Sequence, residues 1–167
     1  MNIKITNDKL ILLNIVLKKM GVYPGKKFAY VRNRNLIKLK NIIYQFENKY
    51  KPSQEYNQFE DSRIKLCENH AKNEKGEVLY LKDGNFNIQN QVEFHKEYEA
   101  LEKENHSIVN QRNKEIDEYN AELEKEVSVD LYRLDETDIP ETITGNFYDA
   151  ILPLIKSEEE SKIKIVK

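Results

Sequence analysis

Cys67 and three histidines are the residues of this chain that most often serve as nucleophiles, bases or metal ligands. His70 follows Cys67 by three positions, so a helix would place both side chains on one face. A catalytic cysteine also needs a third group that orients its histidine, and the sequence offers none. No two of His70, His95 and His106 are three or four residues apart, so a helical two-histidine metal site is not expected. We therefore predict structural or solvated roles for all four residues.

Closely spaced carboxylates occur in two groups, at residues 97–104 and 122–126. General acid–base catalysis needs a pocket that shifts the pKa of such groups. On a long helix they form a solvated face and pair with lysines four residues away. The five glycines form neither a GxGxxG nor a GxxxxGK[ST] motif, so a phosphate-binding loop is not expected. We therefore predict that the chain is not an enzyme and uses no cofactor and no metal.

Residues 25–40 interleave six basic side chains with two aromatic rings. Nucleic-acid grooves combine cations that neutralise phosphates with rings that stack on bases. Phe28 follows the apolar stripe, which leaves Tyr30 as the ring expected to be exposed. Nucleic-acid binding here would depend on salt and would be lost when Arg32 and Arg34 become alanine. The candidate contacts to nucleic acid or to a protein partner are Lys26, Lys27, Tyr30, Arg32, Arg34 and Lys38.

The charge is distributed unevenly along the chain, although the net charge is only −2. Residues 1–51 carry twelve Lys and Arg against two acids, which gives +10, and the remaining residues carry −12. Three explanations stay open. The basic segment packs beside acidic helices of the same chain, or it binds nucleic acid, or it contacts a protein partner.

Asp83 and Gly84 lie between two short alternating runs, Val78–Leu81 and Asn85–Ile88. Both residues tolerate the positive φ that a tight turn needs, so the pattern predicts a β-hairpin over residues 77–89. Its candidate contact residues are Tyr80, Asp83 and Phe86.

Helical periodicity predicts most of the remaining elements. Ser53 is expected to cap one helix, and Asn90 with Glu93 forms a capping-box pattern that opens a long one. The long helix is too polar to stand alone, and the nearest partner is the helix before the β-hairpin, antiparallel to it. The β-hairpin would then turn the chain at the tip of a helical arm. The predicted helices span residues 7–20, 26–50, 53–73 and 91–125, and a short helix follows Thr144.

Alternating residues at 2–5 and 127–131 predict two strands that pair and close a base under the arm. The expected fold class is α+β, mainly α: an antiparallel helical-hairpin arm with a β-hairpin at its tip, on a small base of N- and C-terminal strands and short helices. With 167 residues we expect a single domain. Its base is 1–50 and 126–155, its arm 53–125, and 156–167 is a frayed tail. No run of about 18 apolar residues is present, so no membrane span is expected.

Four segments resemble a group of uncharacterised small proteins encoded by tailed bacteriophages and prophages. They are GKKFAYVRNRNLIKLK at 25–40, KPSQEYNQFEDSRIKLCENHAKNEKGE at 51–77, DGNFNIQNQVEF at 83–94 and EVSVDLYRLDETDIPETITGNFYDAILPLI at 126–155. The likeness covers most of the chain and rests on the pattern of residue types and on short matching sequences. It implies a phage origin and a gene near those for head or tail assembly. It implies no catalytic residues.

These observations favour a non-enzymatic phage protein that acts by protein–protein interaction. Its most concrete form is a head or tail assembly factor or a minor virion component. The alternative is a phage-encoded inhibitor of a host defence system or host enzyme, and a third hypothesis is a nucleic-acid-binding module that uses residues 26–40. We expect a protein partner from the virion or the host, leave homo-oligomerisation open, and expect the host cytoplasm or the virion as location.

Overall fold

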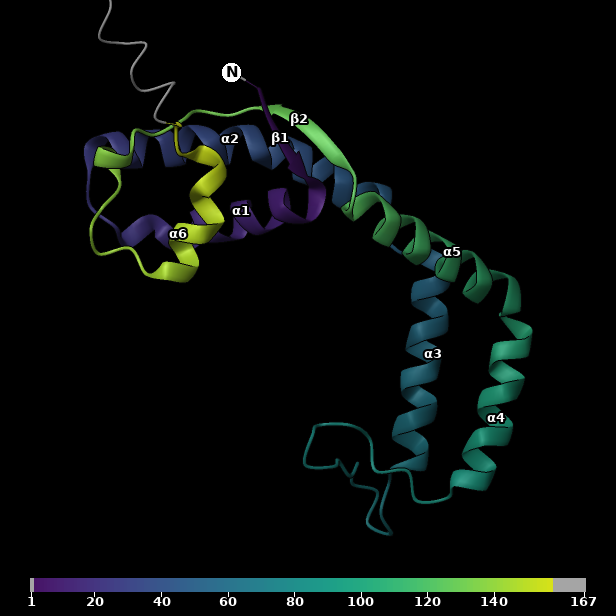
Figure 1. Cartoon of the computed structure of the whole chain (residues 1–167). Coiled ribbons are helices and arrows are strands. Elements are labelled where there is room, and N and C mark those ends of the chain that lie inside the picture. The colour runs from purple at the N-terminus through teal and green to yellow at the C-terminus, as the bar shows by residue number, and fades with distance from the viewer. Residues whose placement is uncertain (1, 158–167) are drawn as a thin grey trace, which may run out of the picture. The chain divides into compact units, whose positions relative to one another are not determined.

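The computed structural model describes residues 2–157, which are mainly helical with one small antiparallel sheet (Figure 1). This confirms the predicted α+β, mainly α class. The chain divides into two compact units: unit 1 is Met1–Lys49 with Tyr119–Lys167, and unit 2 is Tyr50–Glu118. The single-domain assignment stays a prediction, and most of the predicted tail, residues 158–167, lies outside the described residues. Within residues 2–157, no helix is both long enough and apolar enough to cross a membrane.

The sheet of unit 1 joins two segments that are far apart in sequence. Strand β1 (Asn2–Thr6) pairs antiparallel with strand β2 (Glu126–Asp130), so that Ile3 lies opposite Val129 and Ile5 opposite Val127. Side chains alternate between the two faces of a strand, so these four apolar residues share one face. Ile3, Ile5 and Val129 are buried. The predicted pairing of the two strands is confirmed.

Two helices contribute many of the buried residues of unit 1. Helix α1 (Asn7–Lys19) buries Leu10, Leu13 and Leu17, and helix α2 (Lys26–Lys49) follows after a short 3-10 turn, η1 (Met20–Val22). Both helices match their predicted spans to within a residue. Gly21 lies within the 3-10 turn and does not take up a positive φ.

The segment after β2 completes the core of unit 1. It contains the 3-10 turns η2 (Glu136–Asp138) and η3 (Leu152–Leu154) and helix α6 (Gly145–Ile151), with Thr144 at the N-cap as predicted. The buried Leu134 donates its N–H to the carbonyl of Leu154 at 2.7 Å and accepts from the N–H of Lys156 at 2.9 Å. These two bonds hold the end of the described chain against the core.

Unit 2 is built from helices that pack in antiparallel fashion. Helix α3 (Gln54–His70) lies beside helix α4 (Gln91–Glu104), and helix α5 (His106–Leu123) follows (Figure 1). Both predicted caps are confirmed, since Ser53 Oγ accepts from the N–H of Tyr56 at 3.1 Å and Asn90 Oδ1 accepts from that of Glu93 at 3.3 Å. The buried residues of unit 2 are Tyr50, Phe59, Cys67 and Ala71.

The predicted single helix over residues 91–125 is wrong, because it is interrupted at Asn105. The side-chain amide of Asn105 donates to the carbonyl of Leu101 at 2.9 Å, the same oxygen that accepts its backbone N–H at 3.2 Å. Asn side chains compete with backbone groups in this way and favour helix ends. Helix α4 therefore stops at Glu104, and the carbonyl of Asn105 starts α5 by accepting from Ile108 and Val109.

The predicted β-hairpin over residues 77–89 forms its turn but not its strands. Tyr80 and Phe86 make one isolated antiparallel bridge, and Lys72 and Val78 make another. Leu79 explains the difference, because its N–H donates to the carbonyl of Ala71 while its own carbonyl accepts from Asn87. In an antiparallel ladder a hydrogen-bonded residue exchanges both its N–H and its carbonyl with one partner, so a residue that divides them between two segments interrupts the ladder.

Candidate functional site

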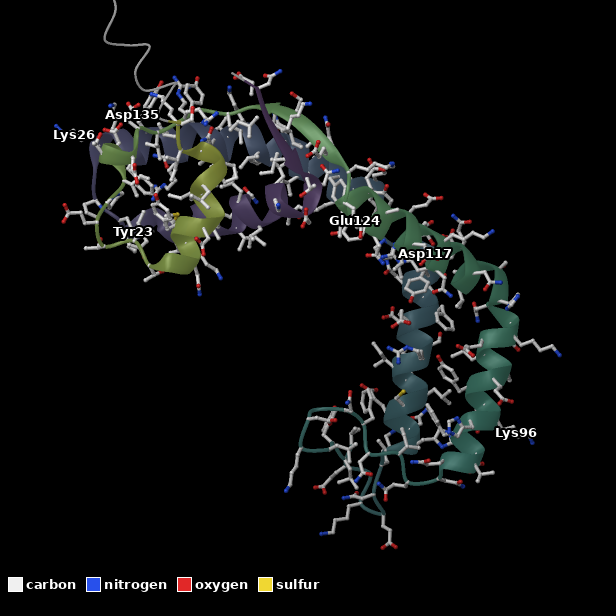
Figure 2. The ribbon with its side chains drawn as sticks, viewed as in Figure 1. Tyr23, Lys26, Lys96, Asp117, Glu124 and Asp135 are labelled. Atoms are coloured by element: carbon white, nitrogen blue, oxygen red, sulfur yellow. The ribbon has the colours of Figure 1, made fainter. Side chains whose placement is uncertain are left out.

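The six basic and aromatic residues singled out between positions 26 and 38 all lie on α2. The apolar stripe of α2 faces the core with Phe28, Val31 and Leu39 buried. Figure 2 labels Lys26 at the start of this helix and Asp135 in the segment that follows β2. That segment carries the carboxylates and the aromatic ring that meet one flank of α2.

Lys27 forms ion pairs with two carboxylates of unit 1. Its Nζ lies 2.7 Å from Asp138 Oδ2 and 3.5 Å from Asp135 Oδ2. The Asp138 carboxylate, through this contact, raises the pKa of Lys27. Asp135 also meets Lys156 Nζ at 2.8 Å, so two lysines share this acidic pair.

Lys38 is also engaged inside unit 1. Its Nζ donates to the backbone carbonyl of Asp130 at 2.8 Å and to the carboxylate of the same residue at 2.7 Å. It lies 4.5 Å from the centroid of the Tyr132 ring, within the range of a cation–π contact. The Lys38 ammonium lowers the pKa of Asp130. Internal pairing therefore accounts for Lys27 and Lys38.

Tyr30 and Arg34 form a small surface stack. The Tyr30 ring meets the Tyr132 ring edge-on with centroids 6.0 Å apart, and the Arg34 guanidinium lies 5.4 Å from the Tyr30 centroid. Tyr30 is exposed, as the sequence predicted. Its ring is already covered on one side by Arg34, which limits the face that remains for an incoming base or side chain.

Arg32 is partly buried and binds the backbone at the first residue of η1. Its Nη1 donates to the carbonyl of Met20 at 3.0 Å, and its Nε and Nη2 donate to Asn33 Oδ1. A Cβ added at Gly21 would lie 3.2 Å from this Nη1, so a glycine lets the guanidinium approach the backbone. Arg32 thus has a structural contact that a nucleic-acid ligand would have to replace.

The three residues predicted at the turn, Tyr80, Asp83 and Phe86, lie together in unit 2. The Tyr80 and Phe86 rings contact each other with centroids 5.3 Å apart, and Tyr80 is 58% exposed. Asp83 accepts from the N–H of Asn85 at 3.0 Å and from its side-chain amide at 3.0 Å. The N–H of Asn85 is the main cause of the lowered pKa of Asp83. Gly84 has φ +86°.

The turn that carries these residues is a three-residue loop and not the two-residue Asp-Gly turn that was predicted. Leu81 donates its N–H to the carbonyl of Asn85 at 2.7 Å and accepts from Gly84 at 3.0 Å, which encloses residues 82–84. Asp83 keeps a negative φ, so only Gly84 adopts the left-handed conformation. This is the geometry of a type I turn followed by a left-handed glycine.

The loop before and after the turn is also held by hydrogen bonds. Asn73 Oδ1 accepts from the N–H groups of Lys75 and Glu77 at 2.9 and 3.0 Å, and its amide donates to the Glu77 carboxylate at 2.9 Å. Gln89 donates its N–H to the carbonyl of His70 at 2.8 Å. Exposed Tyr80 and partly buried Phe86 therefore lie together on a hydrogen-bonded loop.

Sequence patterning missed the role of Asn35. This residue is fully buried, and its side chain both accepts from the N–H of Tyr132 at 2.8 Å and donates to the carbonyl of Tyr132 at 3.0 Å. The available signal was a polar residue between Val31 and Leu39 at helical spacing on the apolar stripe. It binds the segment after β2 to α2 and so positions Asp130 and Tyr132.

The cysteine and the histidines occupy separate environments. Cys67 is buried, while His70 Nε2 lies 3.2 Å from Glu97 Oε2 and its ring packs edge-on against Phe94. His106 Nε2 lies 2.8 Å from the amide of Asn110. Across residues 2–157, no three His, Cys, Asp or Glu side chains gather as a metal-ion site requires.

The chain matches no protein-family model, no curated protein and no solved structure.

Proposed function

We propose that this chain is a non-enzymatic bacteriophage protein that acts by binding another protein, as a head or tail assembly factor or a minor virion component. The resemblance of residues 25–40, 51–77, 83–94 and 126–155 to small phage proteins supports the phage origin. The ordered loop that presents Tyr80 and Phe86 supports the protein-binding role. In this proposal α3 and α4 form an arm with that loop at its tip.

The aromatic pair of exposed Tyr80 and partly buried Phe86 is the observation that carries the proposal. Aromatic side chains are enriched at protein interfaces and supply much of their binding energy. Leu81, which is 48% exposed, extends the apolar surface beside the pair. Because the loop is already hydrogen-bonded, binding would order few additional groups, and preorganisation of this kind favours affinity.

The proposal is tested by tagged capture from cells with and without phage infection, after nuclease treatment and with mass-spectrometric identification. The wild-type chain is compared with a Tyr80→Ser, Phe86→Ser double variant and with Val92→Ser, whose side chain is 83% exposed elsewhere in unit 2. Phage head or tail proteins should be captured by the wild type and by Val92→Ser, and lost from the double variant. Circular dichroism melting establishes that all three chains are folded.

Two results would overturn the proposal. One is the absence of phage proteins among the specific partners of the wild type after infection. The other is undiminished capture by the folded double variant, which would exclude the aromatic pair as the contact. Sedimentation velocity on the purified chain tests homo-oligomerisation at the same time, since a second copy would be a partner of another kind.

The exposed carboxylates of α4 favour one alternative, an inhibitor of a host defence system or host enzyme. Glu93, Glu97, Glu99 and Glu104 are all exposed, and Figure 2 shows Lys96 on the same helix extending away from α3. An acidic helix surface resembles the charge of a nucleic-acid backbone. Capture of a single host nuclease, polymerase or defence complex without infection would place this alternative first, with the host cytoplasm as its location. A virion component would instead be found in purified particles.

A further inference from the structure

A groove on unit 1 contains none of the individual contact residues that were named from the sequence. It lies between α1 and α2 and has a volume of about 420 Å³. Ile37 and Tyr44 are each 64% exposed at its edge. Both line the groove together with Leu36 and Ile43, and an apolar surface that gathers several side chains in this way marks a binding surface. The apolar residues and the two lysines that line the groove are Leu36, Ile37, Ile43 and Tyr44, with Lys18 and Lys40.

The length of the groove suits a short helix. Its α2 side runs from Leu36 to Glu47 at helical spacing. With a rise of 1.5 Å per residue this is roughly 16 Å, or about three helical turns. A ligand helix of similar length would place one apolar stripe along the groove, which is the helix-in-groove mode of recognition.

The walls of the groove favour a helical ligand over an extended one. Both walls are α-helices, whose backbone N–H and carbonyl groups bond within their own helix. An extended peptide would therefore find no strand edge with which to pair its backbone. A helix satisfies its own backbone groups and offers only side chains to the groove.

The charges at the groove favour an acidic ligand. Lys18 and Lys40 lie at its rim, and neither pairs with a carboxylate within residues 2–157. Glu47 is the only acid among the residues that line it. Complementary charge at the rim of an interface selects the partner and speeds association. Nucleic acid fits less well, because most of the lining is apolar and phosphate recognition depends on several cations.

We infer that the groove between α1 and α2 binds an amphipathic helix of a partner protein, whose apolar residues pack on Ile37 and Tyr44 and whose acidic residues meet Lys18 and Lys40. The inference goes beyond the contact proposed at Tyr80 and Phe86, which lies in unit 2. The two sites are tested by different variants, so one can fail while the other holds.

The test uses three synthetic helical peptides of about 18 residues, or five turns. All carry the same Leu and Phe stripe at positions i, i+3, i+4 and i+7, and they differ only in flanking residues, which are Glu, Lys or Gln. Binding to the whole chain is followed by fluorescence anisotropy at low salt. The Glu peptide should bind at least about tenfold more tightly than the Lys peptide, with the Gln peptide between them.

Substitutions then place the peptide in the groove. Ile37→Glu should weaken binding of the Glu peptide at least about tenfold, because it adds a like charge to the apolar surface. The control Val92→Glu adds the same charge at a more exposed site in unit 2 and should leave affinity unchanged, as should Tyr80→Ser. The double variant Lys18→Glu, Lys40→Glu should reverse the preference toward the Lys peptide.

Several outcomes would overturn the inference. They are no binding of the Glu peptide up to about 1 mM, equal affinity for all three peptides, or affinity that Ile37→Glu does not change. Self-association that Ile37→Glu abolishes would assign the groove to a second copy of the chain. Binding of a fluorescent oligonucleotide that the Glu peptide displaces would assign it to nucleic acid.

Discussion

The side chain of Asn35 pairs with the peptide group of Tyr132 through two hydrogen bonds of 2.8 and 3.0 Å, across 97 positions of sequence. Tyr132 lies just after β2 and has no strand beside it. The Asn35 amide takes the place of a neighbouring strand, because it accepts from the N–H of Tyr132 and donates to its carbonyl. The contact is fully buried at Asn35, so water cannot take its place. It also positions Asp130 and the Tyr132 ring beside α2, where Lys38 meets both.

Replacing Asn35 with leucine is expected to lower the free energy of unfolding by about 2 kcal/mol, because the N–H and the carbonyl of Tyr132 lose their partners in a partly buried contact. The measurement is urea unfolding followed by circular dichroism. Asn41→Leu is the control, since Asn41 is exposed on the same helix and its replacement should change stability by less than about 0.5 kcal/mol. Equal effects of the two substitutions would contradict the role given to Asn35.

Replacing Lys38 with methionine is expected to raise the pKa of Asp130 toward its ordinary value, since the Lys38 ammonium is the main cause of its lowering. A carboxyl group whose pKa is lower in the folded chain stabilises the fold above its unfolded pKa, and this stabilisation disappears as pH falls through the folded pKa. The Lys38→Met substitution should therefore lower stability at about pH 7, and this difference from the wild type should shrink below about pH 4. Carboxyl-carbon NMR titration measures the shift, and Lys40→Met should leave Asp130 unchanged.

Replacing Asp83 and Gly84 together with alanine is expected to loosen the three-residue turn. Alanine at position 84 is strained at φ +86°, and the Asp83 side chain no longer accepts from Asn85. Hydrogen exchange should quicken at residues 79–89 and stay unchanged at residues 2–20 and 127–155. Uniform loss of protection across those two ranges would show that the turn and unit 1 unfold as one.

Nucleic-acid binding by residues 26–40 is expected to be absent at low salt, because Lys27, Arg32 and Lys38 already donate to partners within unit 1. Fluorescence anisotropy with single- and double-stranded oligonucleotides measures this. An affinity that falls steeply with salt and disappears in the Arg32→Ala, Arg34→Ala variant would restore the nucleic-acid hypothesis. The double variant has to be checked for folding, since Arg32 also holds the carbonyl of Met20.

Short-range sequence patterns, such as alternation and helix caps, correctly predicted the two strands and the starts of two helices. The alternation around Ile3 and Val129 located the two strands, and Ser53 and Asn90 located the starts of two helices through their caps. Several residues of α3 and α4 that recur at helical spacing are partly or fully shielded: Phe59, Arg63, His70, Phe94 and Tyr98. Periodicity is informative here because each helix is long enough to repeat it several times.

The failures came from single polar side chains and from distant contacts. Asn105 ends a helix because its side-chain amide competes for the carbonyl of Leu101. The periodicity of apolar residues carries no information about a single hydrogen bond of this kind. Leu79 donates its N–H to Ala71 and so does not form a regular ladder. Asn35 bonds to Tyr132, which is distant in sequence and close only in the folded chain. Ile37 and Tyr44 lie off the core-facing stripe of α2, so the groove became visible only when α1 was packed beside them.

The pairing of β1 with β2 has a consequence for synthesis on the ribosome. Unit 1 takes its strands from residues 2–6 and 126–130, and Leu134 is held by Leu154, so its core stays incomplete until nearly all of the described chain has emerged. Every residue of unit 2 has been made by Glu118. Domains generally fold as units as they leave the ribosome. The middle of this chain can therefore acquire its structure before β2 is available to pair with β1 and before α6 is available to pack on α1.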